Sequence, residues 1–219
     1  MKITRIHSPF PAAYIDDFIP SRALVRSAEE SFNQVEDKDW VKYGVDEGQV
    51  QRCTKNRQCT TPASLAVLDY IASCFDPNST FLNLTTSAFP DLSYYGGGMM
   101  VAPNSQGEGG YLGMHVDAET HKENSTWKRE YSAVLCVSEI NDPSFDLWLH
   151  DGKDKHTRIP YKFNRLNIFK CSDNSWHGFP EITKGLDRKT LGVMYWSKVD
   201  EGGKNLRVRA EFNNDLEFK

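Results

Sequence analysis

The stretch GYLGMHVDA places an imidazole and a carboxylate two residues apart, at His115 and Asp117. In a β-strand the side chains at positions i and i+2 project from the same face, so these groups can occupy adjacent corners of one metal coordination sphere. His121 follows in the polar run AETHKENSTWKRE and would lie roughly 20 Å from His115 if the strand continued, although a loop could fold it back. Two ligands do not complete a metal site, so a third must come from elsewhere.

The candidates for the third ligand are the remaining histidines: His7, His121, His150, His156 and His177. His177 lies in CSDNSWHGFPEI, between two apolar segments and beside a tryptophan, where a histidine is expected to face inward. His156 lies in the charged, turn-like run KDKHTR, and His7 has no strand context. His177 is therefore the preferred third ligand, while the alternative for any buried histidine is a hydrogen-bonded core residue.

Arg188 begins the apolar segment RKTLGVMYWS, eleven residues after His177. Burying an arginine is unfavourable unless it meets an anion. Two histidines and one carboxylate leave three positions open on an octahedral ion, the arrangement of non-haem Fe(II) oxygenases, and a bidentate 2-oxo acid and O₂ can fill them. Arg188 could then bind the distal carboxylate of 2-oxoglutarate, with Thr190 on the same strand face adding a hydroxyl donor. The alternatives are a surface arginine after KGLD and a threonine that only favours the strand.

The first third of the chain is expected to be helical. Ser21 can cap a helix that runs to about Phe32, and Thr61 followed by Pro62 can begin a second one through ASLAVLDYIASCF. Between them, residues 35–60 are polar and charged, with Trp40 as one of two isolated aromatics. A connection of this length is uncommon without a role, so it is a candidate lid over a site.

From residue 92 onward, short β-like runs alternate with turn residues. The eight candidate strands are MMVA, GYLGMHVDA, YSAVLCVSEI, DLWLH, RIPY, RLNIFKC, WHGFPEI and KTLGVMYWS. No helical crossover separates them, which favours a double-sheet jelly roll over a parallel sheet. We therefore expect a mainly β, α+β fold: one domain over 1–219, with helical support in 1–91, a double-stranded β-helix (jelly-roll, cupin-like) core in 92–199 and a tail strand in 200–219.

Composition excludes several classes of protein. A net charge of −4 gives no basic field for nucleic acid, and no apolar run is long enough to span a membrane or to serve as a signal peptide. The five cysteines are odd in number and form no CxxC pair, which is typical of a reducing compartment. The expectation is a cytoplasmic protein, a monomer or homodimer, without a nucleic-acid or membrane partner.

Taken together, the motifs resemble the 2-oxoglutarate- and Fe(II)-dependent dioxygenases, and within them the prolyl 4-hydroxylase-like group. The shared pattern is GGYLGMHVD, WKREYSAVLCVS, RLNIFKCSDNSWHGFPEI and DRKTLGVMYW. An N-terminal FPAAYIDDFIP is similar to the family's opening strand and helix start. The resemblance implies that His115, Asp117 and His177 are the catalytic iron ligands and that Arg188 binds the C5 carboxylate of 2-oxoglutarate.

The resemblance also implies a reaction. An unactivated C–H bond, foremost that of a prolyl residue in a peptide or protein, would be hydroxylated with release of succinate and CO₂. The cofactors would be Fe(II), 2-oxoglutarate and O₂, with ascorbate as a further candidate. Asp117 favours hydroxylation over halogenation, because halogenating relatives replace this carboxylate by a small residue. The alternatives are hydroxylation of a free amino acid or other small molecule, a non-oxidative cupin-like metal-binding protein, and a binding module without turnover.

One position departs from the family pattern. On the strand after the HxD loop, prolyl hydroxylase-like proteins often carry a tyrosine that contacts 2-oxoglutarate, whereas this chain has Leu135 and Cys136. The corresponding hydroxyl group either comes from elsewhere, with Tyr95 and Tyr111 as the candidates, or is absent.

Overall fold

The computed structural model of the protein describes residues 3–44, 48–54, 66–67, 100–120, 126–199 and 206–218. They form antiparallel strands and one α-helix, α1 (Arg22–Ser31). The strands of the N-terminal part are β1 (Ile3–Ile6), β2 (Ala12–Ile15), β3 (Trp40–Tyr43) and β4 (Gln49–Thr54). The remaining strands are β5 (Met100–Gln106), β6 (Tyr111–Val116), β7 (Trp127–Cys136), β8 (Leu147–His150), β9 (His156–Ile159), β10 (Leu166–Lys170), β11 (Trp176–Phe179), β12 (Arg188–Lys198) and β13 (Glu211–Phe212).

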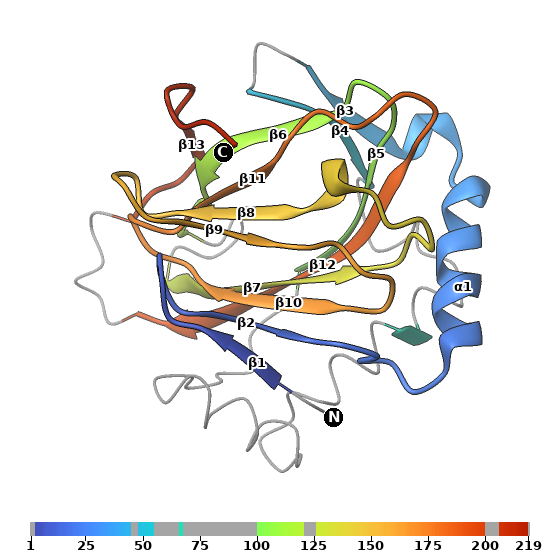
Figure 1. Cartoon of the computed structure of the whole chain (residues 1–219), viewed down its shortest axis with the longest axis horizontal. Helices are drawn as coiled ribbons and strands as arrows, with labels where there is room; N and C mark the ends of the chain where they lie inside the picture. Colours follow the sequence, from blue (N-terminus) through green and yellow to red (C-terminus); the bar gives the residue numbers. More distant parts are fainter. Residues whose placement is uncertain are drawn as a thin grey trace.

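The strands make two layers that share β4 (Figure 1). The larger sheet has the order β1-β2-β10-β7-β12-β5-β4, and the smaller one continues as β4-β6-β11-β8-β9. Neighbours in each sheet are often distant in the sequence, as in β12 beside β5 and β11 beside β6. This is the wiring of a jelly roll, so the expected core architecture and its eight strands are confirmed.

The larger sheet is buried on both faces, and β7 shows why. Tyr131 and Leu135 belong to the main hydrophobic cluster, together with Val25 and Ala28 of α1. Ser132 and Cys136, which alternate with them, are also buried but lie on the opposite face. One face of the sheet therefore packs against the helix, and the other faces the interior between the sheets.

The helix predicted from Ser21 is confirmed. Ser21 is the N-cap residue of α1, and its hydroxyl accepts a hydrogen bond from the backbone N–H of Leu24 at 3.3 Å. Most of the second expected helix lies outside the described residues, although residues 66–67 are helical. The wider expectation of a helical first third is not confirmed, because strands β1 to β4 occupy much of its described part.

Residues 35–60 were predicted to be a long polar connection between helices and a candidate lid, and their described part contains two strands that this prediction did not include. Two strands, β3 and β4, form a hairpin in which Trp40 pairs with Thr54, and β4 continues into both sheets. The hairpin thus lies beside β6, which carries the HxD motif.

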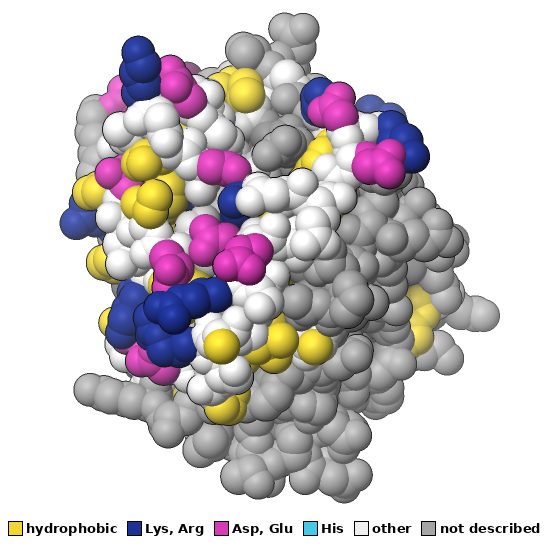
Figure 2. Space-filling view, turned by 90° about the vertical axis from the view of Figure 1, so that its right-hand side faces the viewer, with side chains coloured by type: hydrophobic (Ala, Val, Ile, Leu, Met, Phe, Trp, Pro, Cys, Tyr) yellow, Lys and Arg dark blue, Asp and Glu magenta, His cyan; other side chains and the backbone are white. Residues whose placement is uncertain are grey.

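Charged side chains of both signs are interspersed with hydrophobic ones on the face that contains α1 (Figure 2). Ion pairs such as Arg22–Asp17 and Arg26–Glu139 account for part of this mixture. The described part of this face therefore carries no extended field of one sign. No helix among the described residues is long and apolar enough to cross a membrane.

Candidate metal centre

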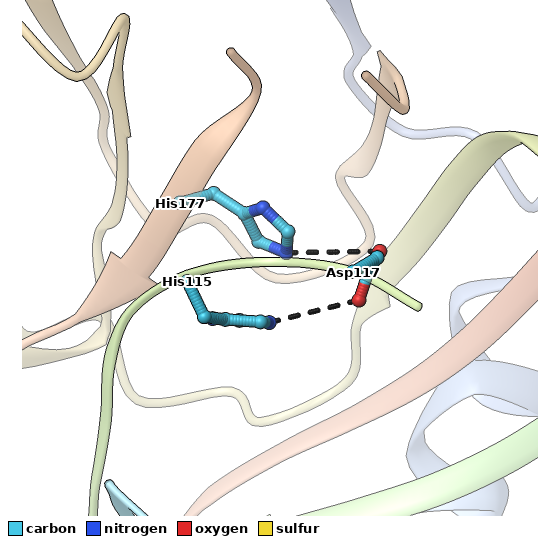
Figure 3. A group of neighbouring side chains, drawn as sticks. All are labelled: His115, Asp117 and His177. Atoms are coloured by element: carbon cyan, nitrogen blue, oxygen red, sulfur yellow. Dashed lines mark ion pairs between the residues drawn. The ribbon is translucent and has the colours of Figure 1, made fainter. Parts of the chain in front are cut away.

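The structure brings His115, Asp117 and His177 together, although His177 is far from the other two in the sequence (Figure 3). His115 on β6 and His177 on β11 are direct partners across an antiparallel pair, and Asp117 follows the end of β6. The His115 Nε2 atom lies 3.6 Å from Asp117 Oδ1, and the His177 Nε2 atom lies 3.9 Å from Oδ2. One ligand atom from each residue can be chosen so that all three lie within 4.8 Å of one another.

Both imidazoles are oriented by the backbone. The Nδ1 atom of His115 lies 3.0 Å from the carbonyl oxygen of Gly113, and that of His177 lies 2.9 Å from the carbonyl oxygen of Ser175. A carbonyl only accepts, so each Nδ1 carries a proton, and each Nε2, which faces Asp117, is the ring nitrogen left to bind a metal ion. This is the arrangement that protein metal sites use to orient histidine ligands, and the donor set fits a divalent cation.

The ionisation states also fit a metal site. Burial opposes the charge of Asp117, but Arg129 and the two histidines outweigh it and hold the pKa of this carboxyl well below its usual value. Burial, reinforced by His115, lowers the pKa of His177 to about 4. At neutral pH the carboxylate is therefore anionic and the His177 imidazole neutral, the forms that bind metal ions.

Both oxygens of Asp117 have further partners behind the triad. The Arg129 guanidinium lies 2.8 Å from Oδ1, and the Ser132 hydroxyl donates to Oδ2 at 2.8 Å. The Cys171 thiol is 3.8 Å from Oδ2, and burial raises its pKa to about 12, so it remains protonated. Arg129 was not predicted from the sequence to belong to this site.

Arg188 is buried with uncharged partners. Its Nε donates to the carbonyl oxygen of Phe145 at 3.1 Å and its Nη1 to the amide oxygen of Gln106 at 3.2 Å. The guanidinium lies 4.2 Å from the centre of the Phe179 ring, and burial lowers the pKa of Arg188. Phe179 is two positions beyond His177 on β11, a step of about 6.6 Å. Arg188 therefore contacts β11, the strand that also carries His177.

Thr190 lies two residues beyond Arg188 on the same strand face and is buried. It is the direct partner of Cys136 on β7, while Leu135 faces the hydrophobic cluster on the other side of the sheet. The Asn167 side chain of β10 also reaches Cys136, with its Nδ2 3.6 Å from Sγ, and its Oδ1 has no hydrogen-bond partner among the described residues. An amide group thus lies beside the position where relatives often carry tyrosine.

The other candidate residues lie elsewhere or outside the described part. His150 accepts a hydrogen bond from the Gly152 N–H, and its ring stacks on the exposed His156. His7 is exposed. Both His121 and Tyr95 lie outside the described residues. Tyr111 is the first residue of β6 and is partly exposed.

Gly178 permits the close approach of β11 to β6. A Cβ atom at this position would collide with the carbonyl oxygen of Leu112 and lie 2.9 Å from that of Gly113. We expect Gly178→Ala to force the strands apart and weaken Co(II) binding roughly tenfold, as measured by calorimetry. Gly107→Ala is the control, because a Cβ there meets no atom within 4 Å. Equal affinity in both variants would show that strand spacing does not control the site.

Comparison with known families identifies the class of protein. The model of the 2OG-Fe(II) oxygenase superfamily matches residues 94–210, more than half of the chain, so the protein belongs to this superfamily. The match includes β6, β11 and β12, which carry the triad histidines and Arg188. The protein is an oxygenase that uses Fe(II) and 2-oxoglutarate, and its fold resembles that of prolyl hydroxylases.

Solved structures share the fold at low sequence identity. A prolyl 4-hydroxylase from Pseudomonas putida is 13% identical with a TM-score of 0.62, covering 86% of this chain and 92% of its own. A Trichoplax adhaerens prolyl hydroxylase, in complex with a hypoxia inducible factor peptide fragment, is 14% identical with a TM-score of 0.59 and coverages of 84% and 83%.

Not all of the similar structures are prolyl hydroxylases. HygX from Streptomyces hygroscopicus, with nickel and 2-oxoglutarate bound, is 10% identical with a TM-score of 0.55 and coverages of 84% and 82%. No curated protein matches the chain significantly.

Proposed function

We propose that this protein hydroxylates a prolyl residue in a peptide or protein, with His115, Asp117 and His177 as the iron ligands. The observation that carries the proposal is the close cluster of these three side chains, together with a buried guanidinium that has uncharged hydrogen-bond partners and lies against Phe179, two residues beyond His177. Two of the similar solved structures are prolyl hydroxylases, which supports the substrate class. Retention of Asp117 supports hydroxylation, because it keeps all three protein ligands on the metal.

Each residue would have a defined part in the reaction. His115 and His177 present Nε2 atoms whose direction is set by the backbone carbonyls, and Asp117 supplies the negative charge. When Fe(II) and 2-oxoglutarate are bound, they supply the chemistry: oxidation of a C–H bond by O₂ is coupled to the formation of succinate and CO₂ from 2-oxoglutarate. Arg188 binds the C5 carboxylate of 2-oxoglutarate, and Thr190 adds a hydroxyl donor.

The surroundings of Arg188 support this role for it. The rings of Phe179 and Tyr161 lie 4.2 and 5.8 Å from the guanidinium and keep water from it, which strengthens a charge-assisted hydrogen bond. The Tyr161 hydroxyl accepts a hydrogen bond from the Ser138 N–H and donates one to the Lys189 carbonyl. It is therefore committed to the backbone, and we infer that the Asn167 amide takes the place of the missing tyrosine.

Two experiments test the proposal in order. Anaerobic addition of Fe(II) and then 2-oxoglutarate to the metal-free protein is expected to produce the weak visible charge-transfer band of the chelate, and His177→Ala is expected to lose it. Metal binding without a band in the wild type would favour a non-oxidative, cupin-like protein.

The substrate is then tested by succinate formation and mass spectrometry. Proline-containing peptides are compared with free amino acids and with an aminoglycoside, since a HygX structure contains hygromycin B. Gain of one oxygen atom on a prolyl residue is the expected result. If a free amino acid or an aminoglycoside is turned over and the peptides stay unmodified, the proposed prolyl substrate is wrong and the substrate is a small molecule.

A further inference from the structure

The C-terminal residues 206–218, here called the tail, run along the edge of β6 that is not covered by β11 (Figure 1). In β13, Glu211 pairs with Val116 and Phe212 pairs with His115, and the Asn213 N–H donates to the Met114 carbonyl at 2.9 Å. Further along, the N–H groups of Glu119 and Thr120 donate to the Arg207 carbonyl at 2.7 and 3.0 Å. The tail therefore holds the backbone on both sides of Asp117.

The side chain of Arg207 connects the two segments that carry the triad. Its Nε donates to the backbone carbonyl of Asp117 at 2.9 Å, and its Nη1 lies 2.9 Å from the carboxylate of Asp173. Asp173 lies in the turn before β11, four residues ahead of His177. The Arg207 side chain is only 10% exposed, and its backbone N–H also donates to the Glu119 carboxylate. One planar guanidinium thus joins the end of β6 to the approach of β11.

Phe212 contacts the other ligand of the HxD motif, His115. Its ring stacks on the His115 ring with centroids 5.2 Å apart and an interplanar angle of 23°. The opposite neighbour of His115 is the His177 ring, at 4.2 Å. Gly48, at φ +70, lets the chain pass close to Phe212, since a Cβ there would lie 2.7 Å from its ring. The imidazole of His115 is therefore enclosed between two rings and tied by Nδ1 to Gly113.

We propose that the tail is part of the metal centre, with Arg207 and Phe212 as positioning residues that set the directions of Asp117 and His115. The proposal rests on the ligand assignment of the proposed function. The family model ends at residue 210, so the Phe212–His115 stack lies beyond the segment that the superfamily match covers. Groups that orient metal ligands without touching the metal typically change metal affinity by 10–100-fold when they are lost.

The test is titration of the metal-free full chain with Co(II), whose visible bands report coordination geometry, together with the Tm of each metal-free variant. Phe212→Leu keeps apolar volume but removes the flat ring, and Phe212→Tyr restores the ring. Arg207→Lys keeps the charge but cannot reach Asp117 and Asp173 together as a planar fork does. Val208→Ala is the matched control, since Val208 is 74% exposed in the same segment.

We expect Phe212→Leu and Arg207→Lys to weaken Co(II) binding roughly tenfold and to shift its visible bands. Phe212→Tyr and Val208→Ala should bind Co(II) as the wild type does. If Phe212→Leu and Arg207→Lys lower only the Tm and leave Co(II) affinity and bands unchanged, the tail is a purely structural element and the proposal is overturned. If the wild type itself does not bind Co(II), the ligand assignment fails first, and the tail proposal with it.

Discussion

Asp117→Ala is expected to abolish Fe(II) binding in anaerobic calorimetry. The substitution removes the only anionic ligand of the triad, and it also leaves the Arg129 guanidinium, now 2.8 Å from Asp117 Oδ1, without that partner. An uncompensated cation beside the site repels a second cation, so the loss should exceed that of His177→Ala. Removing one partner of a buried ion pair also destabilises the fold, by about 3–5 kcal/mol.

A double variant separates these two effects. Asp117→Ala with Arg129→Met removes both charges, so the fold should regain stability in denaturant unfolding while Fe(II) binding remains absent. His121→Ala is the control for histidine loss near the HxD motif and is expected to bind Fe(II) normally. Retention of wild-type affinity by Asp117→Ala would refute the carboxylate assignment, and loss of affinity in His121→Ala would mean that His121 is a ligand.

Arg188→Ala is expected to raise the concentration of 2-oxoglutarate needed for half-maximal succinate formation by at least tenfold. The guanidinium is buried against Phe179 and hydrogen-bonded to uncharged oxygens, so the C5 carboxylate would be its principal anionic partner. Loss of one member of such a pair costs about 3–5 kcal/mol, more than a factor of ten requires. Iron affinity in the absence of 2-oxoglutarate should be unchanged.

Lys189→Ala is the matched control, because it removes an equal charge from the next position of β12, on the opposite face. Its ammonium lies 3.9 Å from the carboxylate of Asp187. Arg188→Lys should need a 2-oxoglutarate concentration between those of the wild type and Arg188→Ala, since a lysine keeps the positive charge but cannot form two parallel hydrogen bonds to a carboxylate. Asn167→Leu tests the amide group that we infer to replace the tyrosine. It should raise the 2-oxoglutarate concentration needed for half-maximal succinate formation several-fold. An unchanged 2-oxoglutarate dependence in Arg188→Ala would place the anchor elsewhere.

Much of the fold follows from alternation in the sequence. The pattern of β7, with Tyr131 and Leu135 toward the helix and Ser132 and Cys136 inward, is readable from a period of two. The His115–His177 proximity could be inferred because the chemistry needs a third ligand and His177 lies in an apolar segment. Neither inference needed the register of the sheets.

Other contacts could not be read in this way. Arg129 lies two residues before Tyr131 and would share its face in a regular strand, yet it contacts Asp117 on the interior side, because the pairing of β7 with β12 shifts register between Tyr195 and Trp196. A β-bulge of this kind turns a side chain to the other face, and no residue type announces it. The strand β4 was not predicted because its mostly polar sequence, QVQRCT, contains no apolar run, although it pairs with β3, β5 and β6. The Phe212–His115 stack depends on a pairing between β13 and β6 that spans almost half of the chain.

The direct pairing of His115 with His177 ties metal loading to folding. Their strands are separated in the sequence by β7 to β10, and such non-local pairings form slowly. If the ligands are assigned as proposed, a metal ion binds only when β6 and β11 are paired. Such an ion stabilises the native state by about 2.7 kcal/mol when its free concentration is ~100 times its Kd. Resistance to proteolysis should therefore rise with iron supply, which makes the amount of this protein in a cell responsive to the metal it uses.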